Sequence, residues 1–299
     1  MGSSIDRRTV RTRPQIQDRS LAIGLAWWLL PWLIMAAPAV AETTPPEQAS
    51  SSSNAQLAEK LSNPVASLIS VPLQFNYDSR IGPDERGRKN YLNLQPVVPV
   101  SISDDWNMIS RTILPVVSQA DTFPGSGSQH GIGDITQSLF FSPKKPTPGG
   151  WILAIGPVFL LPTASDSLLG GKKWGAGPTA LALRQAHGWT YGVLMNQIWS
   201  YASVNGRDEQ RPPISSLFVQ PFLAYNTPAA WTFGVNSEST YDWHGHQATV
   251  PINFTAAKLT RLGKLPVSFT GGVRYWVASN DNGPHGWGYR FVVTALFPH

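Results

Sequence analysis

The connections between the strand-like runs constrain the fold of this chain more than any single run does. The links alternate in length: 101–105, 142–149, 185–188, 226–229 and 260–265 are short, whereas 78–89, 119–132, 163–173, 202–213 and 278–286 are longer and rich in Gly, Asp, Asn and Ser. The exception is 242–246, which is short although it falls on the long side. Short connections at one end of antiparallel strands and long ones at the other are typical of outer-membrane barrels.

The runs between these links show no convincing helical periodicity from Ser67 onward. They span 69–77, 90–100, 106–118, 133–141, 151–162, 174–184, 189–201, 214–225, 230–241, 247–259, 266–277 and 287–297. The last run shows their character, because every second residue from Trp287 to Phe297 is apolar and the intervening residues are smaller or more polar. Alternate side chains point to opposite faces of a strand, so this run has one apolar and one mixed face. A strand of a soluble β-sandwich alternates in the same way.

Tryptophan placement favours the membrane barrel over a soluble all-β fold. One set follows short links and another adjoins the long side: Trp106, Trp151, Trp189 and Trp231, and then Trp174, Trp243, Trp276 and Trp287. Two levels of amphipathic aromatic residues match the two interfacial girdles of a membrane barrel. The sequence therefore predicts an all-β fold, a transmembrane antiparallel β-barrel of twelve strands with a short N-terminal helix. Prolines inside the runs need bulges or breaks, because proline cannot donate to a ladder: Pro96, Pro99, Pro115, Pro157, Pro178, Pro221 and Pro251.

The N-terminus has the layout of an export signal. A basic stretch with five arginines precedes an apolar run from Leu21 to Ala37 and a small-x-small site at 39–41. We therefore expect a signal peptide at 1–41, a disordered spacer at 42–66 that contains a short helix near 55–62, and the barrel at 67–299. An uncleaved anchor is the alternative, and Pro31 argues against it.

Composition excludes several classes of function. Without residues 1–41 the net charge falls from +5 to +2, and no basic stripe remains to indicate nucleic-acid binding. The absence of cysteine removes disulfides and thiolate metal sites. The mature part has no 18-residue apolar run, which excludes a helical membrane protein.

Polar residues on the mixed faces are the candidate lining of the lumen. A charge on the lipid face near mid-bilayer costs about 2–4 kcal/mol, so the arginines are expected to point inward. The predicted lumen or substrate-path residues are Arg111, Arg274, Arg290, Glu238, Asn236, Asn253, Asn196, Asn93 and Gln95. They either form a cationic constriction that favours anionic or polar solutes, or they pair and fill a narrow interior.

Catalytic and metal sites are not expected. Five histidines of the mature part precede the terminal one, and all of them fall in predicted links: His130, His187, His244, His246 and His285. None of them is predicted to lie beside a Ser on a strand. A lipid hydrolase built from distant loops stays open as an alternative. His244 and His246 with Asp242 have unspecific spacing for a metal site, and no phosphate loop or other cofactor motif is present. Lys172 and Lys173, if external, are candidates to contact lipopolysaccharide phosphates.

Several runs resemble a group of bacterial outer-membrane proteins often labelled as transporters or "neuromedin U", similar to proteins grouped with the MetA pathway of phenol degradation. They include NPVASLISVPLQFNYD (63–78), LNLQPVVPVSI (92–102), WNMISRTILPVV (106–117), GIGDITQSLFFSP (131–143) and GPVFLLPTASD (156–166). The resemblance continues through GPTALALRQ (177–185), QPFLAYN (220–226) and the last run. It implies an outer-membrane channel for small or aromatic compounds, with no catalytic residues to carry over.

From the resemblance and the pattern together we expect location in the outer membrane of a Gram-negative cell. The expected partners are outer-membrane lipid and lipopolysaccharide, the barrel-assembly machinery and a small-molecule solute, with no nucleic acid. A plugged barrel with a structural or adhesive role is the alternative function. Pro298 and His299 depart from the terminal aromatic residue with which many barrels end.

Overall fold

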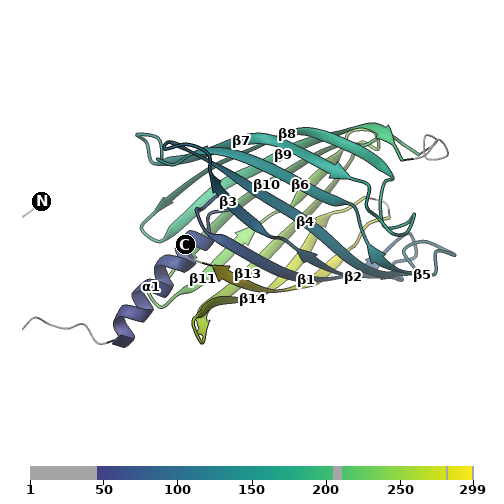
Figure 1. Ribbon diagram of the computed structural model, residues 1–299. Helices are drawn as coiled ribbons and strands as arrows, with labels where there is room; N and C mark the ends of the chain where they lie inside the picture. Colours follow the sequence, from purple (N-terminus) through teal and green to yellow (C-terminus); the bar gives the residue numbers. More distant parts are fainter. Residues whose placement is uncertain (1–45, 205–210, 281, 298–299) are drawn as a thin grey trace, which may run out of the picture. The chain divides into compact units, whose positions relative to one another are not determined.

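Strands from Ile69 to Phe297 close into an antiparallel barrel, which confirms the predicted fold class (Figure 1). The computed structural model describes residues 46–204, 211–280 and 282–297. The expected signal peptide at 1–41 and the two terminal residues lie outside this part of the chain. One helix, α1 (Pro46–Leu61), precedes the strands.

The strand segments follow the predicted runs closely. They are β1 (Ile69–Ile81), β2 (Gly87–Leu94), β3 (Val97–Ser101), β4 (Trp106–Ala120), β5 (Ser128–Ile132), β6 (Ile135–Pro143), β7 (Trp151–Leu161), β8 (Lys173–Ala186), β9 (Trp189–Ser203), β10 (Ser215–Asn226), β11 (Trp231–Asn236), β12 (Ser239–Asp242), β13 (Gln247–Leu262), β14 (Leu265–Ala278) and β15 (Gly286–Phe297). Three spanning strands are each interrupted once, as β2 with β3, β5 with β6, and β11 with β12, so the fifteen segments make twelve strands.

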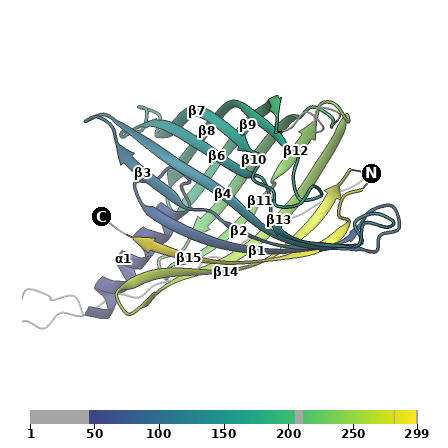
Figure 2. The same ribbon diagram turned by 45° about the vertical axis from the view of Figure 1, so that its right-hand side comes forward.

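One pairing between the first and last strands closes the barrel. β15 pairs with β1 from Ile69 opposite Phe297 to Tyr77 opposite Tyr289, and β9 pairs with β10 as the other consecutive strands do. Each remaining strand pairs with its neighbours in sequence. The start of β1 and the end of β15 therefore lie at the same end of the barrel, next to α1 (Figures 1 and 2).

The three interruptions lie beside prolines of the predicted runs, and Pro251 lies at a register shift in β13, whereas Pro99, Pro157 and Pro178 lie within β3, β7 and β8. β2 ends before Pro96, and the gap between β5 and β6 faces Pro115, whose carbonyl accepts from Gly133 N–H at 2.9 Å. The gap between β11 and β12 faces Pro221 in the same way, through Ser237 N–H at 3.1 Å. Because a carbonyl next to proline can still accept, the wall keeps its closure while the ladder loses regularity.

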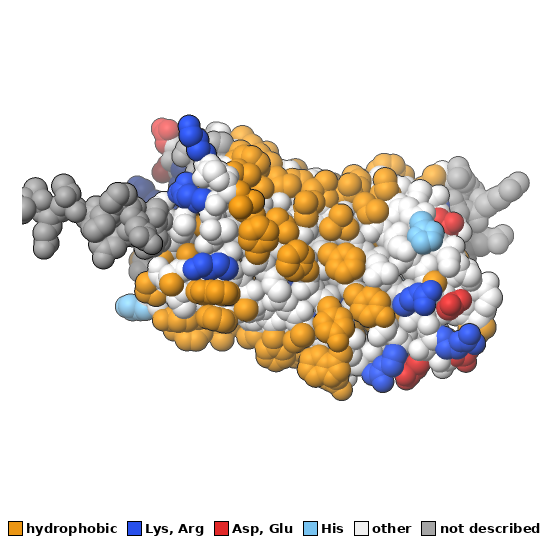
Figure 3. Space-filling model, turned by 90° about the horizontal axis from the view of Figure 1, so that it is seen from below, with side chains coloured by type: hydrophobic (Ala, Val, Ile, Leu, Met, Phe, Trp, Pro, Cys, Tyr) orange, Lys and Arg blue, Asp and Glu red, His pale blue; other side chains and the backbone are white. Residues whose placement is uncertain are grey.

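The outer surface is apolar around the middle of the barrel. On β15 the outward side chains of Trp287, Tyr289 and Phe291 are 50–59% exposed, whereas the inward Arg290 is 6% exposed. Trp106, Trp151, Trp189 and Trp231 are all exposed at the short-turn end, as expected. Figure 3 shows apolar side chains spread over one face, with charged side chains toward its two ends. This distribution is that of a surface in contact with lipid.

A charge on this surface is expected to cost stability according to its depth. Phe291→Arg, at the middle of β15, should lower the free energy of unfolding by about 2–4 kcal/mol, and Trp287→Arg, at the long-loop end, by at most about 1 kcal/mol. Urea unfolding of the barrel in lipid vesicles measures both values. Equal costs at the two positions would contradict a lipid-facing surface.

Helix α1 is longer than the sequence predicts. It ends before Asn63-Pro64 as expected, but it begins at Pro46 and not near residue 55, so most of the expected disordered spacer is helical. Proline is tolerated at a helix start, where its missing N–H has no partner to lose. Arg261 also holds the helix, by donating to Asn54 Oδ1 at 3.1 Å and Ser53 Oγ at 3.2 Å. Among the described residues, no helix is long and apolar enough to cross a membrane.

Candidate functional site in the barrel lumen

A network of charged and amide side chains lines half of the lumen. Its arginines are Arg274 on β14 and Arg290 on β15, and both are almost fully buried. They meet Asn76 and Asp78 from β1 and Asn253 from β13, all inward-facing and at most 3% exposed. The contributing strands are neighbours in the wall, and inward residues of neighbouring strands lie at the same level. The network is thus a direct result of the strand register.

Glycines make room for both arginines. Arg274 pairs with Gly288 across β14 and β15, and Arg290 pairs with Gly272. A Cβ atom on Gly288 would lie 2.6 Å from Asp78 Oδ1, closer than real Cβ atoms come to an oxygen. Because Gly288 has no side chain, Asp78 can reach Arg274 across the position of Gly288 on the inner surface of the barrel.

Arg274 uses all five of its N–H groups. Nε donates to Asn253 Oδ1 at 2.8 Å, and the terminal nitrogens donate to Asp78, Tyr91, Asn76 and Glu238 at 2.6–3.4 Å. Trp276 completes the surroundings: its ring lies 5.2 Å from the guanidinium carbon, and its Nε1–H donates to Asp78 Oδ1 at 3.0 Å. A buried guanidinium is tolerated only when it is bonded in this way.

Arg290 is held by Glu238 through a two-pronged contact. Nη1 and Nη2 donate to the two carboxylate oxygens at 2.9 and 2.6 Å, and Nε donates to Asn76 Oδ1 at 2.9 Å. Glu238 follows β11 at its interruption, and 24% of its side chain is exposed. Nearby, Asn253 donates to Asn236 Oδ1 at 2.8 Å. The break in this strand places a carboxylate beside the two arginines.

The formal charges of the two arginines and two carboxylates of this network cancel, and a further cation, Lys89 on β2, lies beside it with its Nζ 5.6 Å from the Tyr91 ring. Arg274 and Arg290 face Asp78 and Glu238 at 2.6–3.2 Å. Two unpaired cations at a constriction would attract anions, whereas these two are already paired. The arrangement is therefore the paired interior, and it differs from the cationic constriction that the arginines alone indicate.

In the part of the chain that the structure describes, the other predicted lining residues are not hydrogen-bonded to the network. Arg111 on β4 donates to Gln95 Oε1 at 3.2 Å, and Gln95 is 8% exposed. Asn93 on β2 and Asn196 on β9 share the inward alternation of their strands. Within the described chain, neither of these two side chains makes a hydrogen bond to the Arg274 and Arg290 network.

Sequence reasoning misses four members of the network: Asn76, Asp78, Tyr91 and Trp276. The predicted run ends at Tyr77 and leaves Asp78 in a link, but β1 continues to Ile81. Trp276 is expected in the outer girdle, but it bonds Asp78 in the interior. Asn76 accepts from both arginines, and alternation from it identifies Asp78. Alternation from Asn93 identifies Tyr91, and alternation from Arg274 identifies Trp276.

Residues after α1 close the short-turn end of the lumen. Val65 is 5% exposed and packs with wall side chains that include Ile109, Phe140 and Leu194. Ala58 and Leu68 pack on the other side, against a cluster that includes Leu296. We call residues 55–68 the N-terminal plug. Its chain fills the opening with apolar contacts to two sides of the wall.

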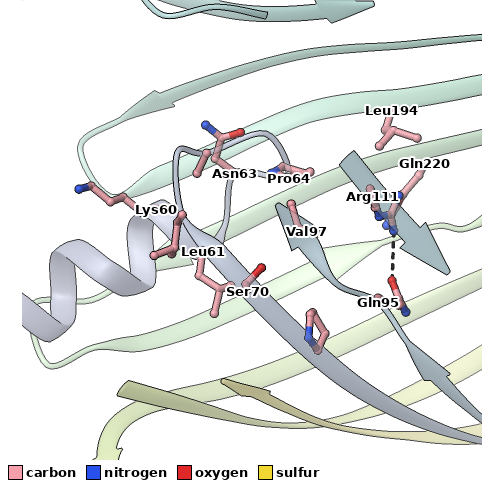
Figure 4. A pocket seen from close by; sticks show the side chains of 13 residues that line it. Lys60, Leu61, Asn63, Pro64, Ser70, Gln95, Val97, Arg111, Leu194 and Gln220 are labelled. Carbon is pink, nitrogen blue, oxygen red and sulfur yellow. Dashed lines mark hydrogen bonds between the residues drawn. The ribbon is translucent and has the colours of Figure 1, made fainter. Parts of the chain in front are cut away.

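Few hydrogen bonds hold the plug to the barrel. Ser62 Oγ donates to Asn226 Oδ1 at 3.0 Å, Gln185 Nε2 donates to the Glu59 carbonyl at 2.8 Å, and Asn107 Nδ2 donates to Ser67 Oγ at 2.9 Å. Between the plug and the wall lies a cavity of about 170 Å³ that Arg111 lines (Figure 4). Apolar packing therefore holds the plug against the wall, and the plug leaves this cavity unfilled.

The histidines correct one part of the sequence reading. His130 lies on β5, not in a link, and it is the cross-strand partner of Ser118 on β4. No hydrogen bond joins a histidine to a serine side chain anywhere in the described ranges. His187 occupies a two-residue turn with Gly188, where both have positive φ. The described residues also contain no group of three or more His, Cys, Asp or Glu side chains able to hold a metal.

The two lysines proposed for lipopolysaccharide are occupied inside the structure. Lys173 is 6% exposed and donates to Ser203 Oγ at 2.7 Å. Lys172 donates to the Ala164 carbonyl at 2.7 Å. Their expected contact with lipid phosphates is wrong for Lys173, because burial removes it from the surface.

Comparison with known proteins shows the fold. No protein-family model and no curated protein sequence matches the chain. An outer-membrane channel from Pseudomonas putida F1 superposes with a TM-score of 0.61 and 14% identity, over 77% of this chain and 96% of the channel. The NanC porin reaches 0.45 with 10% identity over 77% and 100% of the two chains. Outer membrane phospholipase A from Escherichia coli reaches 0.47 with 9% identity over 78% and 98%.

Of these three superpositions, only the first has a TM-score above 0.5, and at 14% identity it establishes a shared fold alone. The chain is an outer-membrane β-barrel. A closed barrel with an apolar outer surface and this fold belongs in the outer membrane.

Proposed function

We propose that the protein is an outer-membrane channel for small polar or anionic solutes, closed at its short-turn end by the N-terminal plug. The observation that carries the proposal is the contrast between the two ends of the lumen. Toward the long loops the wall carries the charged network of Arg274 and Arg290, and at the short-turn end a separate segment of chain blocks the opening. A barrel with a purely structural role would not require a removable closure at one end of its lumen.

The way the plug is held supports its movement. Three single hydrogen bonds, made by Ser62, Gln185 and Asn107, cross the contact, and each is worth about 0.5–1.5 kcal/mol net. The strands, in contrast, are joined by continuous ladders. The plug can therefore leave its seat while the barrel remains closed in cross-section.

Single-channel conductance tests this proposal. The full chain in a planar bilayer should be mostly closed, and a variant that lacks residues 46–66 should conduct persistently. The deletion begins after the expected signal peptide and ends before β1, so export and barrel assembly are preserved. Heat-modifiable migration on a gel verifies the folded barrel. A folded deletion variant without conductance would favour the structural or adhesive alternative.

The proposal includes no enzymatic activity. Ser118 and His130 face each other across β4 and β5, but they lack the hydrogen bond that activates a serine nucleophile. Lipid, lipopolysaccharide and the barrel-assembly machinery remain its proposed partners. An active-site serine probe should leave the folded protein unlabelled, and labelling that is lost in Ser118→Ala would instead support a lipid hydrolase.

A further inference from the structure

The cavity beneath the plug has the composition of a binding site for an anion with an apolar body. Leu61 and Pro64 of the plug and Val97 and Leu194 of the wall give it apolar sides. Its polar groups include Arg111, which stands with Gln95 and Gln220 at the end away from α1 (Figure 4). Pockets that take small molecules commonly combine apolar walls with a few converging polar groups.

The charged side chains that line the cavity are all basic among the described residues. Among the described residues that line the cavity, Lys60 and Arg111 are basic and none is acidic. Glu238 acts on Arg111 electrostatically, but both of its carboxylate oxygens are already bonded to Arg290 and Arg274. The cavity therefore lacks the counter-charge that each arginine of the network possesses.

Most of the N–H groups of Arg111 have no hydrogen-bond acceptor within the described chain. Within the described chain its side chain makes one hydrogen bond, to Gln95, whereas Arg274 uses all five of its N–H groups. A guanidinium with free N–H groups facing a cavity is matched best by a carboxylate, which accepts two parallel hydrogen bonds. The amides of Gln95 and Gln220 add donors that can serve the same oxygens.

The size of the cavity limits the rest of the ligand. A protein cavity of about 150 Å³ admits a benzene molecule, and this one has about 170 Å³. The space therefore suits an apolar body of about six carbons with one carboxylate. Larger solutes would require the plug to move.

We propose that this cavity binds a small monocarboxylate, with the carboxylate on Arg111 and the apolar body between Leu61, Val97 and Leu194. The inference deepens the proposed function, on which it rests for the identity of the solute class. Because the plug supplies part of the lining, a ligand bound there contacts both the plug and the wall. By linkage, such a ligand stabilises the seated plug.

Isothermal titration of the full chain in detergent tests the site, with cyclohexanecarboxylate as the probe. Cyclohexanecarboxamide has the same shape without the charge, and it should bind at least tenfold more weakly, since hydrogen bonds between charged groups are the stronger ones. Cyclohexylmethylammonium should show no binding. Equal affinity for the carboxylate and the carboxamide would overturn the proposal without any variant.

Two variants and one control locate the binding. Arg111→Gln should weaken the carboxylate at least tenfold and leave the carboxamide unchanged, and Val97→Phe should weaken both by filling the cavity. Arg184→Gln, an exposed arginine on β8 that does not line the cavity, should bind like the unmodified protein. Undiminished carboxylate binding by Arg111→Gln would refute the assignment.

Failure of this site and failure of the channel are distinguishable. Conductance after plug deletion together with equal carboxylate and carboxamide binding would remove the site and keep the channel. Selective binding with no conductance in the deletion variant would keep the site and remove the channel.

Discussion

Arg274→Met is expected to lower the free energy of unfolding by about 3–5 kcal/mol, because it removes one member of a buried ion network and leaves Asp78 without its ion pair. Methionine keeps much of the side-chain length, so little space is opened. Asp78 would retain the hydrogen bond from Trp276 but lose its ion pair at 3.1 Å, whereas Glu238 would keep its contact with Arg290. The cost thus comes from the uncompensated charge of Asp78 and from the hydrogen bonds that Arg274 makes to five residues, not from a cavity.

Arg111→Met is the matched control for this effect. It makes the same replacement in the same lumen, but its arginine has one side-chain hydrogen bond within the described chain. We expect a loss of about 1 kcal/mol or less. Urea unfolding of vesicle-inserted protein, followed by tryptophan fluorescence, gives both values. Equal losses would mean that the contacts of Arg274 contribute little to stability.

The pairing of Arg274 with Asp78 can also be separated from its burial. Replacing both residues, as Arg274→Met with Asp78→Asn, removes the stranded charge as well as its partner. The double variant should therefore be more stable than the sum of the two single variants implies, by about 0.5–3 kcal/mol. Strict additivity would indicate that the two charges do not interact through this contact.

The barrel was predictable from the sequence because its constraints are local. Turn lengths, alternation and tryptophan placement each depend on residues within one hairpin, and they located β7, β9 and β15 to within a few residues. Closure followed as well, since a closed barrel requires the last predicted run, 287–297, to pair with the first, 69–77, and β15 pairs with β1. The ends of strands were less certain because a strand that continues beyond the membrane reads like a polar loop. Asp78 and His130 were misplaced for this reason.

The candidate site was predictable only in part. Alternation indicated which side chains point inward, including Arg274, Arg290 and Asn253. It did not indicate how they pair, since pairing depends on register between strands and on the interruption before Glu238. The position of the plug was the largest omission: a short helix near 55–62 was expected, but its place in the opening depends on tertiary contacts of Ala58 and Val65.

Glu238→Gln is expected to make an open form of the channel prefer anions. In the present network two arginines face two carboxylates, so the network itself adds little to the field that a passing ion meets from Arg111. Loss of the Glu238 charge leaves one uncompensated positive charge. A unit charge acts on an ion at about 12 Å with about 1.4 kcal/mol at an effective dielectric constant of about 20, which corresponds to about tenfold in partition.

The measurement is the reversal potential of the plug-deleted channel under a KCl gradient. The deletion alone should select weakly, and the deletion with Glu238→Gln should raise the chloride-to-potassium permeability ratio by up to about tenfold. Adding Arg290→Gln restores the balance of charge and should return the ratio toward its starting value. If Glu238→Gln leaves the ratio unchanged while the barrel stays folded and conducting, ions do not pass the network. The conducting path would then avoid Arg274 and Arg290, and their pairing would serve the barrel wall alone.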